Sequence, residues 1–211
     1  FILNDHHLRP FGVKMKDNTA MTNQIDFDIK SKGRISTSFI DRNILTFKQA
    51  SLFVRQLPYR RNTDKNNLTT VFTDHCGTCS TKHALLKELA VENKFEELKL
   101  IVGLFRMNKN NTPAIASTLL QNNLEYIPEA HCYLKYQDLI LDLTKVNSMP
   151  SDFRDDLIDE IEILPDQITD YKVNYHKNYL AAWLHNHKQL NYTLEEIWSI
   201  REQCIEDLAK S

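Results

Sequence analysis

The chain is organised around residues 74–86, which read Asp-His-Cys-Gly-Thr-Cys-Ser-Thr-Lys-His-Ala-Leu-Leu. Gly77 indicates a turn, and the small polar residues after it predict a helix that begins at Cys79. The first N–H groups of a helix lack partners within the helix, and the positive end of the helix dipole lies there. Both effects favour a thiolate over a thiol, so Cys79 is a candidate nucleophile. Lys82, one turn later, is expected to add a positive charge nearby.

The composition is that of a globular protein with a sizeable core. Hydrophobic residues make up 42% and charged residues 26% of the 211 residues, which suits one domain, alone or with an extension. Lys plus Arg number 26 against 28 Asp plus Glu, so the net charge is −2. This balance gives no electrostatic reason to expect nucleic acid or an anionic membrane as a partner. No apolar run approaches the ~18 residues of a membrane-spanning helix.

The four cysteines are Cys76, Cys79, Cys132 and Cys204, and their spacing is too sparse for a disulfide framework. Free thiols indicate a reducing compartment, so we expect a cytoplasmic protein. The pair Cys76-x-x-Cys79 at a helix start is also the pattern of thioredoxin-like thiol-disulfide oxidoreductases. That fold places the pair in a βαβ unit near its N-terminus, whereas about 70 residues precede it here.

The pattern of apolar residues predicts an α+β domain with a mostly antiparallel sheet. Helices are expected at residues 46–57, with Thr46 as N-cap, and at 79–92, 113–122, 175–188 and 193–209. A buried strand is expected at 98–105, and a hairpin at 131–143 that turns at Gln137 and Asp138. From Ser151 the chain is expected to be helical and acidic, with a short strand or extended connection within 161–168.

These expectations divide the chain into three parts that pack as one domain. They are an N-terminal extension (1–45), a core (46–150) and a C-terminal helical part (151–211). Aromatic residues at helical spacing in the last part indicate that its helices cover the core or form a wall of a substrate groove.

His131 and Asp142 occupy the two strands of the predicted hairpin. With the turn at residues 137 and 138, they are diagonal neighbours, so their side chains can hydrogen-bond if both lie on one face. A carboxylate fixes the tautomer of a histidine, which can then take a proton from a thiol. If the helix of Cys79 packs against this hairpin, the three residues form a Cys-His-Asp triad.

At this point the sequence resembles the transglutaminase-like cysteine-enzyme superfamily, over roughly residues 46–145. The motifs that carry the resemblance are Gly77-Thr78-Cys79 before a helix with Ala84 and Leu85, Glu129-Ala130-His131 at a strand start, and Leu141-Asp142-Leu143-Thr144 on the next strand. The order Cys, His, Asp agrees with the family, whereas the Cys132-Tyr133 pair and the short hairpin depart from it. The resemblance implies a transglutaminase-like fold with a papain-like site, in which a helix bearing the cysteine packs on a sheet bearing the histidine and aspartate.

The resemblance also implies thiol-dependent acyl transfer or amide hydrolysis. Cys79 would form a thioester with a carboxamide or peptide carbonyl, His131 would shuttle the proton, and Asp142 would orient the imidazole. The Cys79 N–H and one further donor would hold the oxyanion, and Tyr59 is a candidate for that donor or for the edge of the site. Family members include protein crosslinkers, peptidases, deamidases and amidases. We therefore expect a peptide or other amide as substrate and no cofactor or metal, with hydrolysis and transfer both open.

Other interpretations stay open. Some family members have lost activity, so the chain could be a non-catalytic binding protein, which predicts an ordinary thiol pKa for Cys79 and no contact between His131 and Asp142. Cys79 could be a small buried side chain, and Tyr59 could merely pack. A zinc site could draw its ligands from His75, Cys76, Cys79, His83, His131 and Cys132. Without a metal, His83 is expected at the edge of the site or on the surface. Nothing indicates the oligomeric state.

Overall fold

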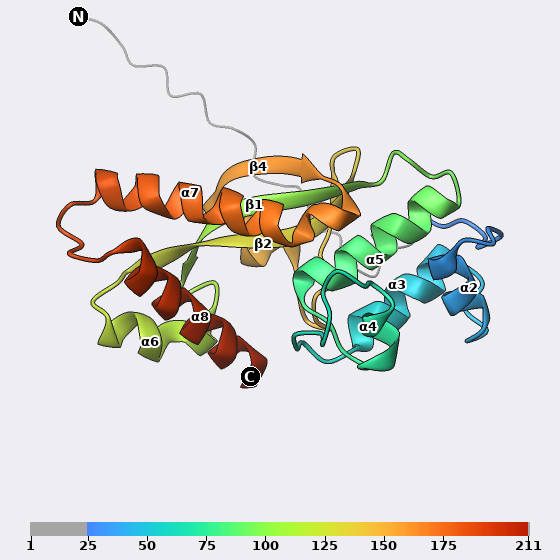
Figure 1. The fold of residues 1–211 in the computed structure, drawn as a ribbon, viewed down its shortest axis with the longest axis horizontal. Coiled ribbons are helices and arrows are strands. Elements are labelled where there is room, and N and C mark those ends of the chain that lie inside the picture. Colours follow the sequence, from blue (N-terminus) through green and yellow to red (C-terminus); the bar gives the residue numbers. More distant parts are fainter. Residues whose placement is uncertain (1–24, 211) are drawn as a thin grey trace, which may run out of the picture.

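The computed structural model describes residues 25–210, which form an α+β fold around a four-stranded antiparallel sheet (Figure 1). The strands are β1 (Lys99–Asn108), β2 (Tyr126–Tyr136), β3 (Leu139–Leu141) and β4 (Leu157–Ile163), in the order β3-β2-β1-β4. The α-helices are α2 (Arg34–Ile40), α3 (Phe47–Gln56), α4 (Thr70–Thr73), α5 (Cys79–Glu92), α6 (Ala116–Gln121), α7 (Asp170–Asn186) and α8 (Leu194–Lys210). Residues 1–24 of the expected N-terminal extension lie outside the described residues, and α2 lies in the rest of it.

Helix α5 begins and ends where the sequence predicts, at Cys79 and Glu92. The Thr78 side chain accepts a hydrogen bond from the N–H of Thr81, and the Thr81 hydroxyl accepts one from the N–H of Thr78. This reciprocal cap fixes the first turn of the helix. The helix is buried on most sides, because β1 and β2 pack on one side and α2 and α3 on another (Figure 1).

The predicted hairpin is present, with its turn at residues 137 and 138. Gln137 has φ 51°, the left-handed conformation that a two-residue hairpin turn favours. Leu134 pairs with Leu141, which is the register that the sequence predicts. Strand β2 starts earlier than expected, at Tyr126, so His131 lies in its middle, opposite Gly103 of β1.

Strand β4 corrects the expectation that the chain is helical from Ser151. Two short 3-10 helices, Pro150–Asp152 and Arg154–Asp156, lead into the strand, which pairs along β1. The alternation of Ile161, Glu162 and Ile163 fits a strand better than a helix. The sheet therefore draws strands from both the expected core and the expected C-terminal part.

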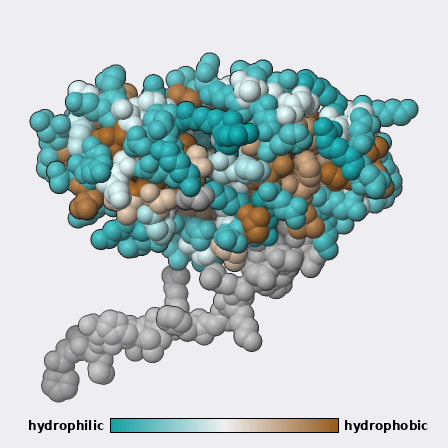
Figure 2. Space-filling view, turned by 90° about the horizontal axis from the view of Figure 1, so that it is seen from below, coloured by the Kyte–Doolittle hydropathy of each residue, from teal (hydrophilic) through white to brown (hydrophobic). Residues whose placement is uncertain are grey.

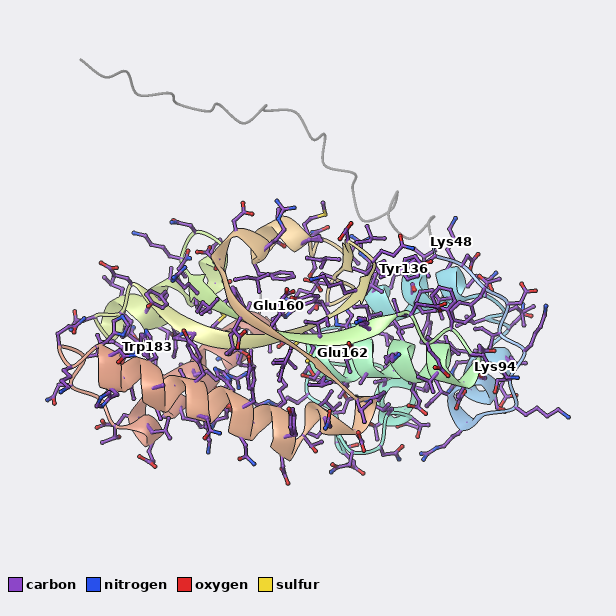
Figure 3. All side chains as sticks on the ribbon, turned by 90° about the horizontal axis from the view of Figure 1, so that it is seen from above. Lys48, Lys94, Tyr136, Glu160, Glu162 and Trp183 are labelled. Atoms are coloured by element: carbon purple, nitrogen blue, oxygen red, sulfur yellow. The ribbon has the colours of Figure 1, made fainter. Side chains whose placement is uncertain are left out.

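As an edge strand, β4 carries acidic side chains that blunt its free edge (Figure 3). Glu160 pairs with Lys135 of β2 at 3.1 Å, and Glu162 pairs with Lys99 of β1 at 2.9 Å. The second half of the acidic stretch that was expected to be helical, Asp159, Glu160 and Glu162, thus carries the exposed side chains of a strand.

Two hydrophobic clusters meet along the sheet. The first joins α2, α3 and α5 to the strands, and the second joins α6, α7 and α8 to them. Cys79 belongs to the first cluster, whereas Phe105 and Phe153 belong to the second. The candidate site therefore lies where two packed halves of the molecule meet.

The face of the molecule that Figure 2 shows is mainly polar. On this face, hydrophilic side chains predominate and hydrophobic ones form separate small groups. Within residues 25–210, no helix is both long and apolar enough to cross a membrane.

The cap of α3 generates a prediction about stability. The Thr46 side chain accepts a hydrogen bond from the N–H of Gln49, and the Gln49 side chain accepts one from the N–H of Thr46. Thr46→Ala removes this cap and should lower the free energy of unfolding by about 1 kcal/mol. Urea unfolding measures the change. Thr46→Ser keeps the hydroxyl and should match the wild type; an equal loss in both variants would contradict the cap.

Candidate active site

Cys79 is the first residue of α5, and the segment Pro58–Arg60 passes beside it. The N–H of Gly77 donates to the Pro58 carbonyl at 3.1 Å, and the N–H of Arg60 donates to the Gly77 carbonyl at 3.3 Å. These bonds place Tyr59 next to Cys79. Gly77 is required here, because a Cβ atom would lie 2.9 Å from Cγ of Lys82.

His131 and Asp142 meet across the hairpin as predicted. Nε2 of His131 lies 3.1 Å from Oδ2 of Asp142, while Oδ1 accepts the N–H of Thr144 at 3.0 Å. The Asp142 side chain is only 5% exposed and that of His131 14%. The Phe153 ring packs edge-on against the imidazole, with centroids 4.9 Å apart. The carboxylate and the ring therefore hold the imidazole in one orientation.

Cys79, His131 and Asp142 line the same cavity, and the pKa values of Cys79 and His131 are each shifted by the charge of the other group. The structure thus brings together the three residues predicted as a triad, and it places Tyr59 beside them. Cys79 is 7% exposed and lines two cavities, so it is not sealed within the core.

His83 connects helix α5, which begins at Cys79, to the residues that follow the hairpin. Its Nδ1–H donates to the Cys79 carbonyl at 2.7 Å, and its Nε2 accepts the N–H of Leu143 at 2.8 Å. Both bonds are satisfied only by the neutral tautomer with the proton on Nδ1. Burial lowers the pKa of His83 to about 4, so the ring stays neutral near pH 7. His83 has no exposed surface, which makes the expectation of a surface histidine wrong.

Lys82, the residue before His83 in α5, also connects this helix to other segments of the site. Its ammonium donates to the carbonyls of Leu57 and Thr144, each at 2.6 Å. Burial lowers its pKa to about 8. Lys82 therefore joins α5 to the segment before Tyr59 and to the residues after Asp142, a structural role that the expectation of a nearby positive charge did not include.

The cation that the sequence did not reveal is Lys172 of α7. Its ammonium donates to the Ser80 hydroxyl at 2.8 Å, and the Cys132 thiol lies 3.4 Å from the same oxygen. Lys172 is 8% exposed and shares a buried helix face with His176, Leu180 and Trp183. In the sequence, Lys172 stands at helical spacing from apolar residues, and this was the one signal that it lies on the buried face of a helix. The spacing does not predict a contact with Ser80, which is 92 residues away.

The charges around the sulfur favour a thiolate–imidazolium pair. The pKa of Cys79 is well below its ordinary value, because the Cys132 thiol donates a hydrogen bond and the Lys172 and His131 charges lie nearby; burial opposes them. Burial would lower the pKa of His131, yet Asp142 and Cys79 raise it to about 10. Burial would likewise raise the pKa of Asp142, but His131 holds it at about 2. The proton therefore resides on the imidazole near neutral pH.

Beside this group, Glu129 of β2 forms a buried ion pair with Arg201 of α8. Arg201 Nε donates to Glu129 Oε2 at 2.7 Å, and Nη2 donates to Oε1 at 2.5 Å. Such a bidentate pair fixes the carboxylate and guanidinium planes relative to each other. The Glu129 carboxylate thus anchors α8 against β2, the strand that carries His131.

Cys79 lines two cavities. The first, about 430 Å³, is lined by Cys79, His131, Phe105, Met107 and Phe153, among others; we call it the histidine-side cavity. The second, about 580 Å³, is lined by Cys79, Ser80, Lys172, Trp198 and Arg201, among others; we call it the lysine-side cavity. Tyr59, Cys79, Glu129 and Ile205 line both. A ligand in either cavity can therefore contact Cys79.

The structure also bears on the two alternative kinds of site, a zinc site and a redox-active pair of cysteines. Among residues 25–210, no group of three or more His, Cys, Asp or Glu side chains is arranged to hold a metal ion. Cys76 and Cys79 are both free thiols, and Cys76 contacts Arg60 Nε at 3.5 Å. The strands of the described sheet pair only in antiparallel fashion, so it lacks the parallel βαβ unit of thioredoxin-like proteins.

Comparisons with protein-family models, with curated proteins and with solved structures find no match to this chain.

The buried neutral His83 predicts a pH dependence of stability. Because its pKa falls from 6.5 to about 4 on folding, the unfolded chain binds a proton that the folded chain excludes between these values. Stability should therefore fall as the pH drops from about 6.5 to 4, by at most ~1.4 kcal/mol per pH unit from this residue.

Urea unfolding of the wild type and His83→Asn across this range tests the prediction. The variant should show a smaller slope of unfolding free energy against pH. His176 also has a pKa lowered by burial to about 4, but it is present in both proteins, so the difference reports His83. Equal slopes of unfolding free energy against pH in the two proteins would show that His83 has the same pKa in the folded and the unfolded chain.

Proposed function

We propose that this protein is a cysteine-dependent enzyme that hydrolyses an amide or transfers its acyl group, with Cys79 as nucleophile, His131 as proton carrier and Asp142 as the group that orients His131. We further infer a transglutaminase-like arrangement, with the cysteine on α5 and the other two residues on the β2–β3 hairpin and just after it. The observation that carries the proposal is the 3.1 Å contact between His131 and Asp142, beside a sulfur that lines two cavities.

The mechanism follows from the protonation states. The Cys79 thiolate attacks the amide carbonyl carbon, and the electrons of the C=O bond move to the oxygen. The C–N bond then breaks as His131 gives its proton to the leaving amine, which leaves a neutral imidazole and a thioester. Because Nε2 of His131 faces Asp142, Nδ1 is the nitrogen that transfers the proton. Water or an amine, deprotonated by the imidazole, then attacks the thioester, and the acyl group leaves the sulfur.

The oxyanion needs donors aimed at the carbonyl oxygen. The N–H of Cys79 lies in the first turn of α5, where N–H groups lack helical partners. The Tyr59 phenol lines both cavities at the sulfur, and within residues 25–210 it makes no hydrogen bond. Burial raises the pKa of Tyr59, so it remains a protonated donor. We assign Tyr59 as the second donor.

The two other interpretations have less support. A non-catalytic protein on this fold predicts an ordinary Cys79 pKa and no contact between His131 and Asp142, whereas the lowered thiol pKa and the contact favour catalysis. A redox role for Cys76 and Cys79 lacks its expected βαβ context.

The thiolate assignment predicts a flat pH profile for alkylation. Iodoacetamide should label Cys79 at similar rates at pH 6 and pH 8, because the pKa of Cys79 is well below its ordinary value. For a free thiol, the alkylation rate falls about a hundredfold from pH 8 to pH 6. Mass spectrometry of digested protein identifies the labelled residue. Cys79→Ala should abolish the fast labelling, and Cys204→Ser should not; fast labelling in Cys79→Ala would refute the nucleophile.

Tyr59 can be tested apart from the nucleophile. Tyr59→Phe should slow acylation by 4-nitrophenyl acetate by roughly 100-fold, since an oxyanion forms in that step. Alkylation by iodoacetamide, which forms no oxyanion, should change less than about twofold. Tyr192→Phe removes a phenol that is bonded to the Asn122 carbonyl instead, and it is the matched control. Equal slowing of both reactions would mean that Tyr59 merely supports the site.

A further inference from the structure

The two cavities beside Cys79 differ in chemistry, and the position of His131 distinguishes their roles. In acyl transfer the leaving amine takes its proton from the imidazole, so it must lie on the side of His131. His131 lines only the histidine-side cavity. The leaving amine therefore occupies that cavity. The acyl group, which stays on the sulfur, occupies the lysine-side cavity.

Beyond the triad the surface that lines the histidine-side cavity is mainly apolar, although Glu129, Lys145 and Asp152 also lie in its walls. Phe105, Met107 and Phe153 line it from β1 and from the chain between β3 and β4, and Leu208 lines it from α8. Burial of apolar surface is favourable in such a cavity. This side therefore suits an amine with an apolar or aromatic substituent.

The lysine-side cavity is charged, with four cations against three carboxylates. Its charged residues are Arg61, Lys65, Lys172 and Arg201, together with Asp64, Glu129 and Glu202. Arg201 pairs with both Glu129 and Glu202, and Arg61 pairs with Glu202. Lys172 is the buried cation of this cavity, and its hydrogen bond goes to the neutral Ser80 hydroxyl. Within residues 25–210, no carboxylate oxygen lies within 4.0 Å of its ammonium.

Acylation changes the charge around Lys172. Before the reaction, the nearby Cys79 thiolate balances the ammonium. When the sulfur becomes a neutral thioester, the ammonium loses the charge of the thiolate, and the nearby Glu129 carboxylate is already paired with Arg201. A carboxylate on the acyl group would restore the balance at the step in which the substrate is held covalently.

We propose, building on the function proposed above, that Lys172 selects a carboxylate-bearing acyl group in the lysine-side cavity, while the histidine-side cavity accepts an apolar amine. The substrate class is thus an amide that joins an acidic acyl half to an apolar amine half. Lys172 is the specificity-determining residue, and Ser80 holds its ammonium in place.

The first test compares two alkylating probes of similar size at Cys79, anionic iodoacetate and neutral iodoacetamide, at low salt. The rate ratio of iodoacetate to iodoacetamide, divided by that of N-acetylcysteine, reports the local positive potential. It should fall about fivefold in Lys172→Met and stay near the wild-type value in Lys172→Arg. The His131 imidazolium is common to all three proteins, so the change isolates residue 172.

The outcomes separate this inference from the proposed function. If both probes label Cys79 rapidly and Lys172→Met leaves the ratio unchanged, the role of Lys172 is overturned and the nucleophile stands. If Cys79 reacts with neither probe faster than a free thiol does, the proposed function falls, and this inference falls with it.

A second measurement needs only the wild type and therefore does not depend on whether Lys172→Met folds. Acylation by the 4-nitrophenyl monoester of glutaric acid is compared with acylation by 4-nitrophenyl butanoate, with Cys79→Ala as the background of each. Both esters carry the same apolar leaving group. The glutarate ester should acylate Cys79 about tenfold faster, relative to N-acetylcysteine. A ratio of one or less would contradict an acidic acyl group.

Discussion

The geometry of this site depends on His83, which joins the first turn of α5 to the residues after the β2–β3 hairpin. One ring nitrogen bonds the Cys79 carbonyl, and the other bonds the N–H next to Asp142. The sulfur and the carboxylate come from segments about 60 residues apart, and each could shift without the other if this ring were absent. Lys82 adds bonds to the segment before Tyr59 and to Thr144. Two consecutive side chains of one helix thus fix three parts of the candidate site.

The charges at the site act as a group. The sulfur lies among an imidazole, an ammonium and a second thiol, while one carboxylate faces the imidazole from behind. These side chains are largely buried, so each charge needs a partner close by. Glu129 and Arg201 balance each other's charge in an ion pair of their own, and this pair anchors α8 beside the site. Lys172 differs from that pair, because its hydrogen-bond partner is a neutral hydroxyl.

Local patterns were sufficient for much of the fold. The cap at Thr46, the bounds of α5 and the hairpin register follow from residues close together in the chain, and the structure confirms them. Strand β4 was predicted only in part: a short strand or extended connection was expected within 161–168, whereas the strand starts at Leu157, in an acidic stretch that resembles a helix face until β1 is known to lie beside it. Lys172 was missed for a related reason: its partner is distant in sequence, and only tertiary packing makes it a neighbour of the sulfur. The meeting of His131 and Asp142 could be predicted, because a tight turn fixes which residues are diagonal neighbours.

The proposed mechanism requires that Cys79 and His131 form a thiolate–imidazolium pair oriented by Asp142, and nitrogen NMR of the His131 ring can detect this pair. We expect both ring nitrogens to carry protons at pH 7.5, since the pKa of His131 is raised to about 10. In Cys79→Ala the pKa should fall, because one of the two anions that raise it is gone. A neutral ring at pH 7.5 in the wild type, with one nitrogen unprotonated, would contradict the ion pair and the mechanism built on it.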